Sequence, residues 1–167
     1  MRKALDAQGF TLLELLVVVT IIGVLAAFSM TQVMRARLAS NEVAAIASMR
    51  SINTAQQGYA QMCHGYATNL PELITAGSFL SPDLASGAVV LKSGYVITLL
   101  AAAGSFPVPV QLGCTGSASN YYATATPGLV GTSGRRAFAT TGQGTIFYDV
   151  TGVPPPDPIP AGALPIQ

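Results

Sequence analysis

The residues whose types and spacing best suit a chemical role lie near the N-terminus, where a single carboxylate stands at the start of a long apolar run. Glu14 is followed by residues 15–34, which contain no charged side chain. An ionised carboxylate near the centre of a bilayer costs about 3 kcal/mol and usually persists only where it has a partner. A cut between Gly9 and Phe10 would create an α-amine at Phe10 and make Glu14 the fifth residue. Since one helical turn separates the two groups, they pair more naturally between staggered neighbouring chains than within one chain.

The stretch around this carboxylate resembles a known processing motif. Residues 9–14 read Gly-Phe-Thr-Leu-Leu-Glu, after a short leader that carries Arg2 and Lys3. Together with the apolar run, they resemble the cleavage and methylation motif of type IV pilins and of the related pseudopilins of type II secretion. The resemblance implies cleavage after Gly9 by a prepilin peptidase, N-methylation of Phe10, and a role for Glu14 in assembly. It also implies export from the inner membrane, through an assembly platform, into a helical filament.

The apolar run itself has rival interpretations. At about 1.5 Å per residue, residues 15–34 span roughly the 30 Å of a bilayer core. A secretory signal peptide also has a basic start and an apolar run, but no small-residue cleavage site cleanly ends this one and Glu14 interrupts its start. A plain single-pass anchor remains open. The flanking charges leave the orientation open, because Arg2 and Lys3 are balanced by Arg35 and Arg37.

Two cysteines offer a covalent link. Cys63 and Cys114 suit an oxidising compartment, where a bridge closing roughly 50 residues would contribute about 4 kcal/mol in the loop-entropy model. Free, buried thiols are the alternative. His64 adjoins Cys63, and because neighbouring residues on a helix do not face each other, we interpret it as a helix-end cation rather than half of a catalytic pair. Neither a zinc site nor a calcium-loop spacing is present, so we predict no metal, no cofactor and no enzymatic activity.

A glycine-rich loop near residue 135 carries the remaining candidate chemistry. Residues 131–136 contain Arg135 and Arg136 but lack the Gly-Lys-Ser/Thr ending of a phosphate loop. Contact with DNA is the functional interpretation, and a solvated hairpin is the alternative. Since no basic stripe interleaved with aromatic residues accompanies the loop, we favour the hairpin and do not expect nucleic acid as a partner.

The elements that would position these residues follow from the periodicity. The absence of proline before Pro71 predicts one helix that continues to about Met62. Its second half has one face that would pack on a sheet (Ala45, Met49, Ile52, Tyr59, Cys63) and an opposite polar face (Arg50, Thr54, Gln57, Gln61).

After the long helix, the pattern changes to short elements. Residues 69–74 predict a short helix with Asn69 as N-cap. Strands are expected over 95–100, 121–126, 136–140 and 145–150, with a hairpin at residues 142–144 that places Ala137 and Phe138 opposite residues 146–148. The proline-rich segment 153–167 predicts an extended tail that covers the sheet edge or is disordered.

Composition supports a packed subunit. Only 9% of the residues are charged, against about 25% in ordinary soluble proteins. A monomer with so few charges would be poorly protected against association, whereas a subunit of a polymer does not need that protection. A weakly charged extracellular head, rich in glycine, alanine, serine and threonine, is the plainer interpretation.

These observations combine into one architecture with four parts. We expect an α+β, pilin-like chain with a leader at 1–9, a transmembrane and filament-core half-helix at 10–34, a head at 35–152 and a tail at 153–167. The predicted function is that of a pilus subunit, anchored in the inner membrane and surrounded by lipid before assembly. Its partners then become other copies of itself, in an extracellular filament or a periplasmic pseudopilus. A type II secretion pseudopilin is one alternative, and a minor pilin or anchored protein that binds DNA or a surface is the other.

Overall fold

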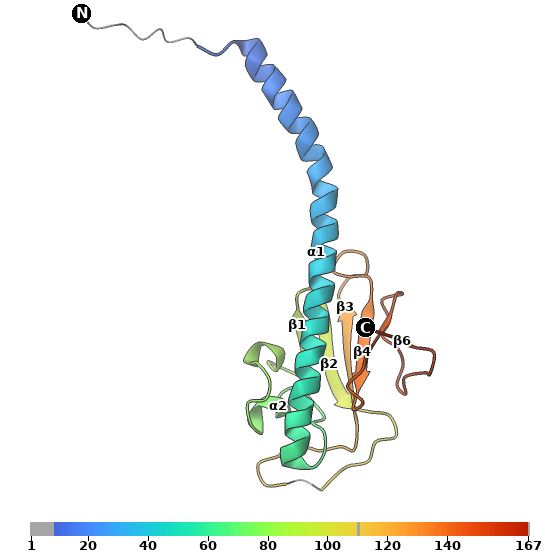
Figure 1. Ribbon diagram of the computed structural model, residues 1–167. Helices are drawn as coiled ribbons and strands as arrows, with labels where there is room; N and C mark the ends of the chain where they lie inside the picture. Colours follow the sequence, from blue (N-terminus) through green and yellow to red (C-terminus); the bar gives the residue numbers. More distant parts are fainter. Residues whose placement is uncertain (1–8, 110, 167) are drawn as a thin grey trace, which may run out of the picture. The chain divides into compact units, whose positions relative to one another are not determined.

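The computed structural model describes residues 9–109 and 111–166, with the side chains of residues 28–31 excepted (Figure 1). The predicted leader therefore lies outside the described residues, apart from Gly9. Helix α1 (Leu12–Cys63) is followed by the single turn α2 (Glu72–Thr75) and the 3-10 turn η1 (Pro82–Leu84). The chain divides into two units, Met1–Ala36 and Arg37–Gln167, and α1 has residues in both.

The second unit, here called the head, is built on one antiparallel sheet. Among the described residues, six strands follow one another in the order β1-β2-β3-β4-β5-β6. The strands are β1 (Val89–Lys92), β2 (Tyr95–Ala101), β3 (Tyr121–Pro127), β4 (Ala137–Thr141), β5 (Ile146–Asp149) and β6 (Leu164–Pro165). Each strand pairs with the next in the chain, so the sheet is a meander (Figure 1). The predicted α+β arrangement is confirmed.

The first hairpin was not predicted. Ser93 and Gly94 join β1 to β2, with Lys92 paired to Tyr95. Both turn residues have positive φ, 49° and 75°, as a two-residue type I′ turn requires. At Gly94 a Cβ would lie 2.8 Å from Cβ of Ser133, so the position has neither the conformation nor the space for a side chain. A Ser-Gly pair between two apolar runs was the available signal for this hairpin.

The predicted hairpin at residues 142–144 is present. The Gly144 N–H donates to the Thr141 carbonyl at 2.8 Å, and Gly144 has a φ of 76°. Phe138 pairs with Tyr148 as expected, but Ala137 pairs with Asp149, one residue beyond the predicted partners. The strands predicted over 136–140 and 145–150 are observed as β4 at residues 137–141 and β5 at residues 146–149, so each bound differs by one residue from the prediction.

The second half of α1 covers one face of the sheet. The predicted apolar face of the helix is fully buried (Ala45, Met49, Ile52, Tyr59, Cys63), and Arg50, Thr54, Gln57 and Gln61 are exposed. Asn53 connects the two layers, since its Oδ1 accepts a hydrogen bond from the Tyr121 hydroxyl at 2.9 Å and its Nδ2 donates to the Gly144 carbonyl at 2.7 Å. Fully satisfied polar contacts of this kind fix how the helix lies on the sheet.

The proline-rich tail covers the opposite face. Tyr121 and Tyr122 point to opposite sides of β3, and because Tyr121 faces α1, Tyr122 faces outward, where its hydroxyl donates to the Pro155 carbonyl. All residues of β4 are buried, as expected for a strand covered on both faces. The tail then returns as β6 to pair with β5, so of the two alternatives left open for the tail, covering of the sheet edge is the one observed. Proline is tolerated there because β6 is an edge strand.

The loop after α1 is fixed by a buried carboxylate. The helix predicted over residues 69–74 is observed as α2 at Glu72–Thr75, and the residue before it is Pro71, so Asn69 is not its N-cap. Asn69 still accepts the Glu72 N–H with its Oδ1 at 3.1 Å. Glu72 in return accepts hydrogen bonds from the Thr68 N–H at 2.7 Å and from Asn69 Nδ2 at 2.7 Å. These reciprocal bonds hold residues 68–72 in one conformation.

Candidate functional site

The described apolar side chains in the N-terminal half of α1 are exposed. Phe10 is 79% exposed, and the large apolar side chains from Leu12 to Leu25 are between 45% and 85% exposed. The one hydroxyl described in this stretch of α1, that of Thr20, donates to the Val17 carbonyl at 2.7 Å and so does not interrupt the apolar surface. By length and composition, α1 can cross a membrane. An apolar surface of this extent marks a site of contact with lipid or protein.

Glu14 forms a capping box at the start of α1. The Glu14 N–H donates to Thr11 Oγ1 at 3.2 Å, and the Glu14 carboxylate accepts from the Thr11 N–H at 3.4 Å and from the Thr11 hydroxyl at 3.3 Å. A negative charge in the first helical turn is also favoured by the helix dipole. Sequence reasoning missed the contribution of Thr11, although Thr-x-x-Glu is a recognised helix-start pattern.

This carboxylate has no counter-ion within the described part of the chain. The ion pairs among residues 9–109 and 111–166 are Lys92–Asp83 and Arg136–Glu42. The hydrogen bonds from Thr11 are weak and lie at an exposed position. Glu14 is therefore held in place by its own chain, while its charge remains uncompensated by any described cation.

Comparison with known proteins identifies the family. Residues 6–30 match the family described as the prokaryotic N-terminal methylation motif. The chain is also 30% identical over 96 residues to the type IV wide pilus major component PilA4 of Thermus thermophilus, across 58% of this chain and 73% of that protein. The chain belongs to the type IV pilin family. No solved structure matches it significantly.

The similarity extends beyond the processing motif. A match of 96 residues is longer than the 25 residues from 6 to 30, so it includes part of the pilin outside the methylation motif. The recognition of a type IV pilin from residues 9–14 is therefore confirmed by a comparison that does not depend on that motif alone. Since type IV pilins are structural subunits, family membership also supports the prediction that the chain is not an enzyme.

The pilin head contains the predicted disulfide. Cys63 and Cys114 are bonded, with Cα atoms 6.0 Å apart and 51 residues of sequence separation. Cys63 is the last residue of α1, and the segment around Cys114 is also held by the Tyr59 hydroxyl, which donates to the Gly116 carbonyl. The disulfide thus joins the end of the helix to the long connection between β2 and β3.

His64 ends the pilin's long helix. It has a φ of 59°, and its N–H donates to the Ala60 carbonyl at 3.0 Å, which is the left-handed conformation of a helix C-cap. Because Cys63 is bonded to Cys114, it has no free thiol, and Cys63 and His64 do not form a nucleophilic pair. Within the described residues, no group of three or more histidine, cysteine, aspartate or glutamate side chains is placed to hold a metal ion.

The two arginines of the 131–136 loop have different surroundings. Arg136 forms an ion pair with Glu42 of α1. Its Nε and Nη2 atoms each lie 2.8 Å from Glu42 Oε2. Its guanidinium also lies 5.3 Å from the ring centre of Tyr148. Arg135 is exposed, as expected for a solvated hairpin, whereas Arg136 is partly exposed, with 38% of its side chain accessible, and also pairs with Glu42. Sequence reasoning missed Glu42, which lies 94 residues away.

The Glu42 carboxylate accepts hydrogen bonds from both arginines of the loop. Partial burial by itself would raise the pKa of Glu42, but hydrogen bonds from the Arg135 and Arg136 N–H groups, with the Arg136 guanidinium, outweigh it and hold that pKa below the ordinary 4.5. The bonds from the two N–H groups measure 3.0 and 3.2 Å. Glu42 therefore stays ionised and connects α1 to the start of β4.

Proposed function

We propose that this pilin is a structural subunit of a type IV pilus filament, cleaved after Gly9, N-methylated at Phe10 and polymerised from the inner membrane. The observation that carries the proposal is the exposure of the described apolar side chains in the first half of α1, a stretch that begins with one carboxylate, Glu14. The similarity to a major pilus component supports a pilus over a secretion pseudopilus.

The mechanism follows from the two environments of α1. Before assembly, the apolar half of the helix lies in lipid, and after assembly it packs against the same half of neighbouring subunits. Lipid and a helix bundle are similarly apolar, so transfer between them need not expose this surface to water. The filament therefore grows by exchanging one apolar neighbour for another, with prepilin peptidase and the assembly platform acting before and during this transfer.

Glu14 gives the transfer its specificity. A carboxylate offers about four lone-pair sites, so Glu14 can keep its contacts with Thr11 and still accept the N-terminal amine of Phe10 from a neighbouring subunit. Among the described residues, the donors to this carboxylate are the N–H and hydroxyl of Thr11, at 3.4 and 3.3 Å. Pairing with a neighbour stabilises the assembled state over the separate subunit and sets the stagger between adjacent helices.

Processing is tested on the native filament. Sheared surface material, digested and analysed by mass spectrometry, is expected to contain a peptide that begins with methylated Phe10. Recovery of chains that retain Met1 from extracellular fibres would overturn the proposed cleavage. Material confined to the cell envelope, with a secretion defect on deletion, would instead assign the chain to a pseudopilus.

The role of the Glu14 charge is separable from its role in capping. Glutamine can occupy the same position of a capping box without a charge. We expect Glu14→Gln and Glu14→Leu both to reach the membrane but to yield few surface filaments, measured by shearing and immunoblotting. Normal filaments from Glu14→Gln would show that capping, and not ion pairing, is what Glu14 supplies.

A further inference from the structure

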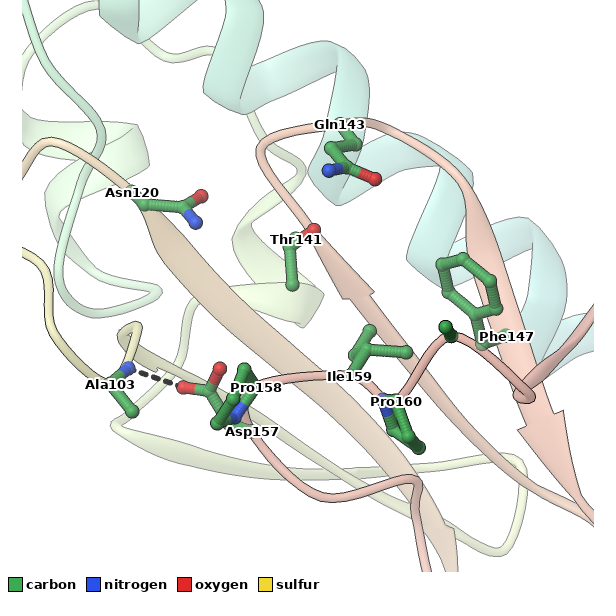
Figure 2. Close-up of a pocket in the computed structure, with 10 residues that line it drawn as sticks. Ala103, Asn120, Thr141, Gln143, Phe147, Asp157, Pro158, Ile159 and Pro160 are labelled. Carbon is green, nitrogen blue, oxygen red and sulfur yellow. Dashed lines mark hydrogen bonds between the residues drawn. The ribbon is translucent and has the colours of Figure 1, made fainter.

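The pilin head contains a cavity that the proposed filament contacts do not use. Its volume is about 390 Å³, and it lies between the ends of β3 and β4, the β4–β5 turn and the tail (Figure 2). This volume lies within the range of about 300–1,000 Å³ that small-molecule sites occupy. The cavity is thus large enough for one ring-sized ligand.

One wall of the cavity is polar. Asn120, Thr141 and Gln143 line it, and Figure 2 shows the Asn120 side chain extending toward Thr141. Asn120 Oδ1 accepts the Tyr121 and Gly142 N–H groups at 2.9 Å each, which fixes the amide. With its oxygen engaged, the amide nitrogen is the group that remains to donate to a ligand, while Gln143 can both donate and accept.

The electrostatics of the cavity select against anions. Asp157 lines it, and within this fully described set of lining residues there is no lysine, arginine or histidine. One oxygen of Asp157 is fixed by the Ala103 N–H (Figure 2). Burial, with the negative charge of Asp157, raises the pKa of nearby Tyr122 to about 12. The negative charge of Asp157 would therefore repel a phosphate, sulfate or carboxylate, whereas it would not repel a neutral ligand.

The other wall is apolar. Phe147, Ile159 and Pro160 lie on the side of the cavity away from Asn120 and Ala103 (Figure 2). Aromatic and aliphatic surfaces of this kind pack against the C–H faces of a ring. The ligand must therefore have an apolar face as well as groups that hydrogen-bond.

We propose that this cavity binds one pyranose ring of a neutral saccharide. Each hydroxyl of a neutral sugar both donates and accepts hydrogen bonds, which matches an amide wall with one acidic acceptor, Asp157. The ring's C–H faces match the wall formed by Phe147 and Pro160. The tail supplies part of the site, so the proline-rich segment has a role in recognition as well as in covering the sheet.

The experiment uses the full-length chain in detergent and immobilised neutral oligosaccharides that end in glucose, galactose, mannose or N-acetylglucosamine, with sialylated oligosaccharides for comparison. We expect saturable binding to at least one neutral probe. Gln143→Ala should weaken it at least tenfold by removing a polar contact, and Ala161→Trp should abolish it by filling the cavity. Gln57→Ala, at an exposed position on α1, is the matched control and should bind as the unmodified chain does.

Three outcomes would overturn the proposal. They are the absence of binding to every neutral probe, a preference for the sialylated probes, and binding that neither Gln143→Ala nor Ala161→Trp weakens. Both substituted residues are exposed, and circular dichroism with intact-disulfide mass confirms that each variant is folded. A loss of binding in either folded variant, without loss in Gln57→Ala, supports the site.

Discussion

The described carboxylates of the head each accept a hydrogen bond from their own chain. The pairs are Glu42 with Arg135 and Arg136, Glu72 with Thr68 and Asn69, Asp83 with Lys92, Asp149 with Thr151, and Asp157 with Ala103. Among the described residues, Glu42 and Asp83 are also ion-paired, whereas Glu72, Asp149 and Asp157 keep a negative charge that is hydrogen-bonded but not neutralised. Glu14 differs from this group because its donors, both from Thr11, are weak and exposed.

Because Thr11 caps the first turn of α1, we predict that removing its hydroxyl loosens that turn. Thr11→Val keeps the shape of the side chain but removes the hydroxyl that accepts the Glu14 N–H. Loss of such a cap costs about 1 kcal/mol, which is roughly a fivefold change in the local equilibrium. We expect the Glu14 amide to exchange about fivefold faster, measured by NMR in micelles. Thr20→Val is the control, and equal acceleration in both variants would contradict the capping role.

The ion pair at Glu42 makes a prediction about acid stability. Because the folded pKa of Glu42 lies below its ordinary 4.5, its contribution is fully present above that value and is lost as the pH falls through the folded pKa. Glu42→Gln should lower the free energy of unfolding by about 2 kcal/mol at pH 7, as expected for hydrogen bonds to a charged group.

Denaturant titration of the full-length chain in detergent at several pH values measures this effect. The difference between the variant and the unmodified chain should shrink below pH 4.5, since protonation removes the same charge. Ser51→Ala, on the exposed side of α1, is the control for substitution in the helix. A difference that stays constant down to pH 2 would show that the charge of Glu42 is not what stabilises the head.

At the level of elements, the sequence predicted those whose signal is local. Helix α1 and strands β2 to β5 have apolar or β-branched runs, and each lies within two residues of its predicted bounds. Strand β1 is as short as β5, with four residues each, and it was missed although the Ser93-Gly94 turn marks its end. Strand β6 has no local signal, since Leu164 and Pro165 form a strand only because the edge of β5 accepts them.

The same distinction applies to the candidate sites. Residues 9–14 were recognisable because a local motif carries them, and the cysteine pair because the chain contains only two. The Glu42–Arg136 pair and the saccharide cavity join segments that are far apart in the sequence, so periodicity gives no indication of them. The cavity in particular depends on the path of the tail, which a proline-rich composition leaves undetermined.

Because the disulfide ties the end of α1 to the connection between β2 and β3, we predict that its removal destabilises the head. Cys63→Ala with Cys114→Ala removes a cross-link across 51 residues, and the loop-entropy model gives a loss of about 4 kcal/mol in the free energy of unfolding. Urea titration of the full-length chain in detergent measures the loss. The unmodified chain should show the same loss in reductant, and an unchanged urea midpoint in both would contradict the prediction.

For the molecule as a whole, the two units have opposite surfaces. The described apolar side chains of the first unit are exposed, whereas the head, which also exposes some apolar side chains, buries a core of its own. The exposed apolar side chains of the first unit are removed from water when the unit lies in lipid or packs against other copies of the chain. Stability of the first unit therefore belongs to the membrane or the filament, and stability of the head belongs to the single chain.

The bond between Cys63 and Cys114 has a consequence for a filament under tension. A force that enters through α1 crosses directly to residue 114, so the intervening segment cannot unravel while the bond is intact. About 50 residues, at roughly 3.5 Å each when stretched, correspond to roughly 170 Å per subunit. Single-filament pulling should show that added length only in reductant, and equal extension in both conditions would contradict the idea. Chemical reduction would thus turn a stiff fibre into a far more extensible one.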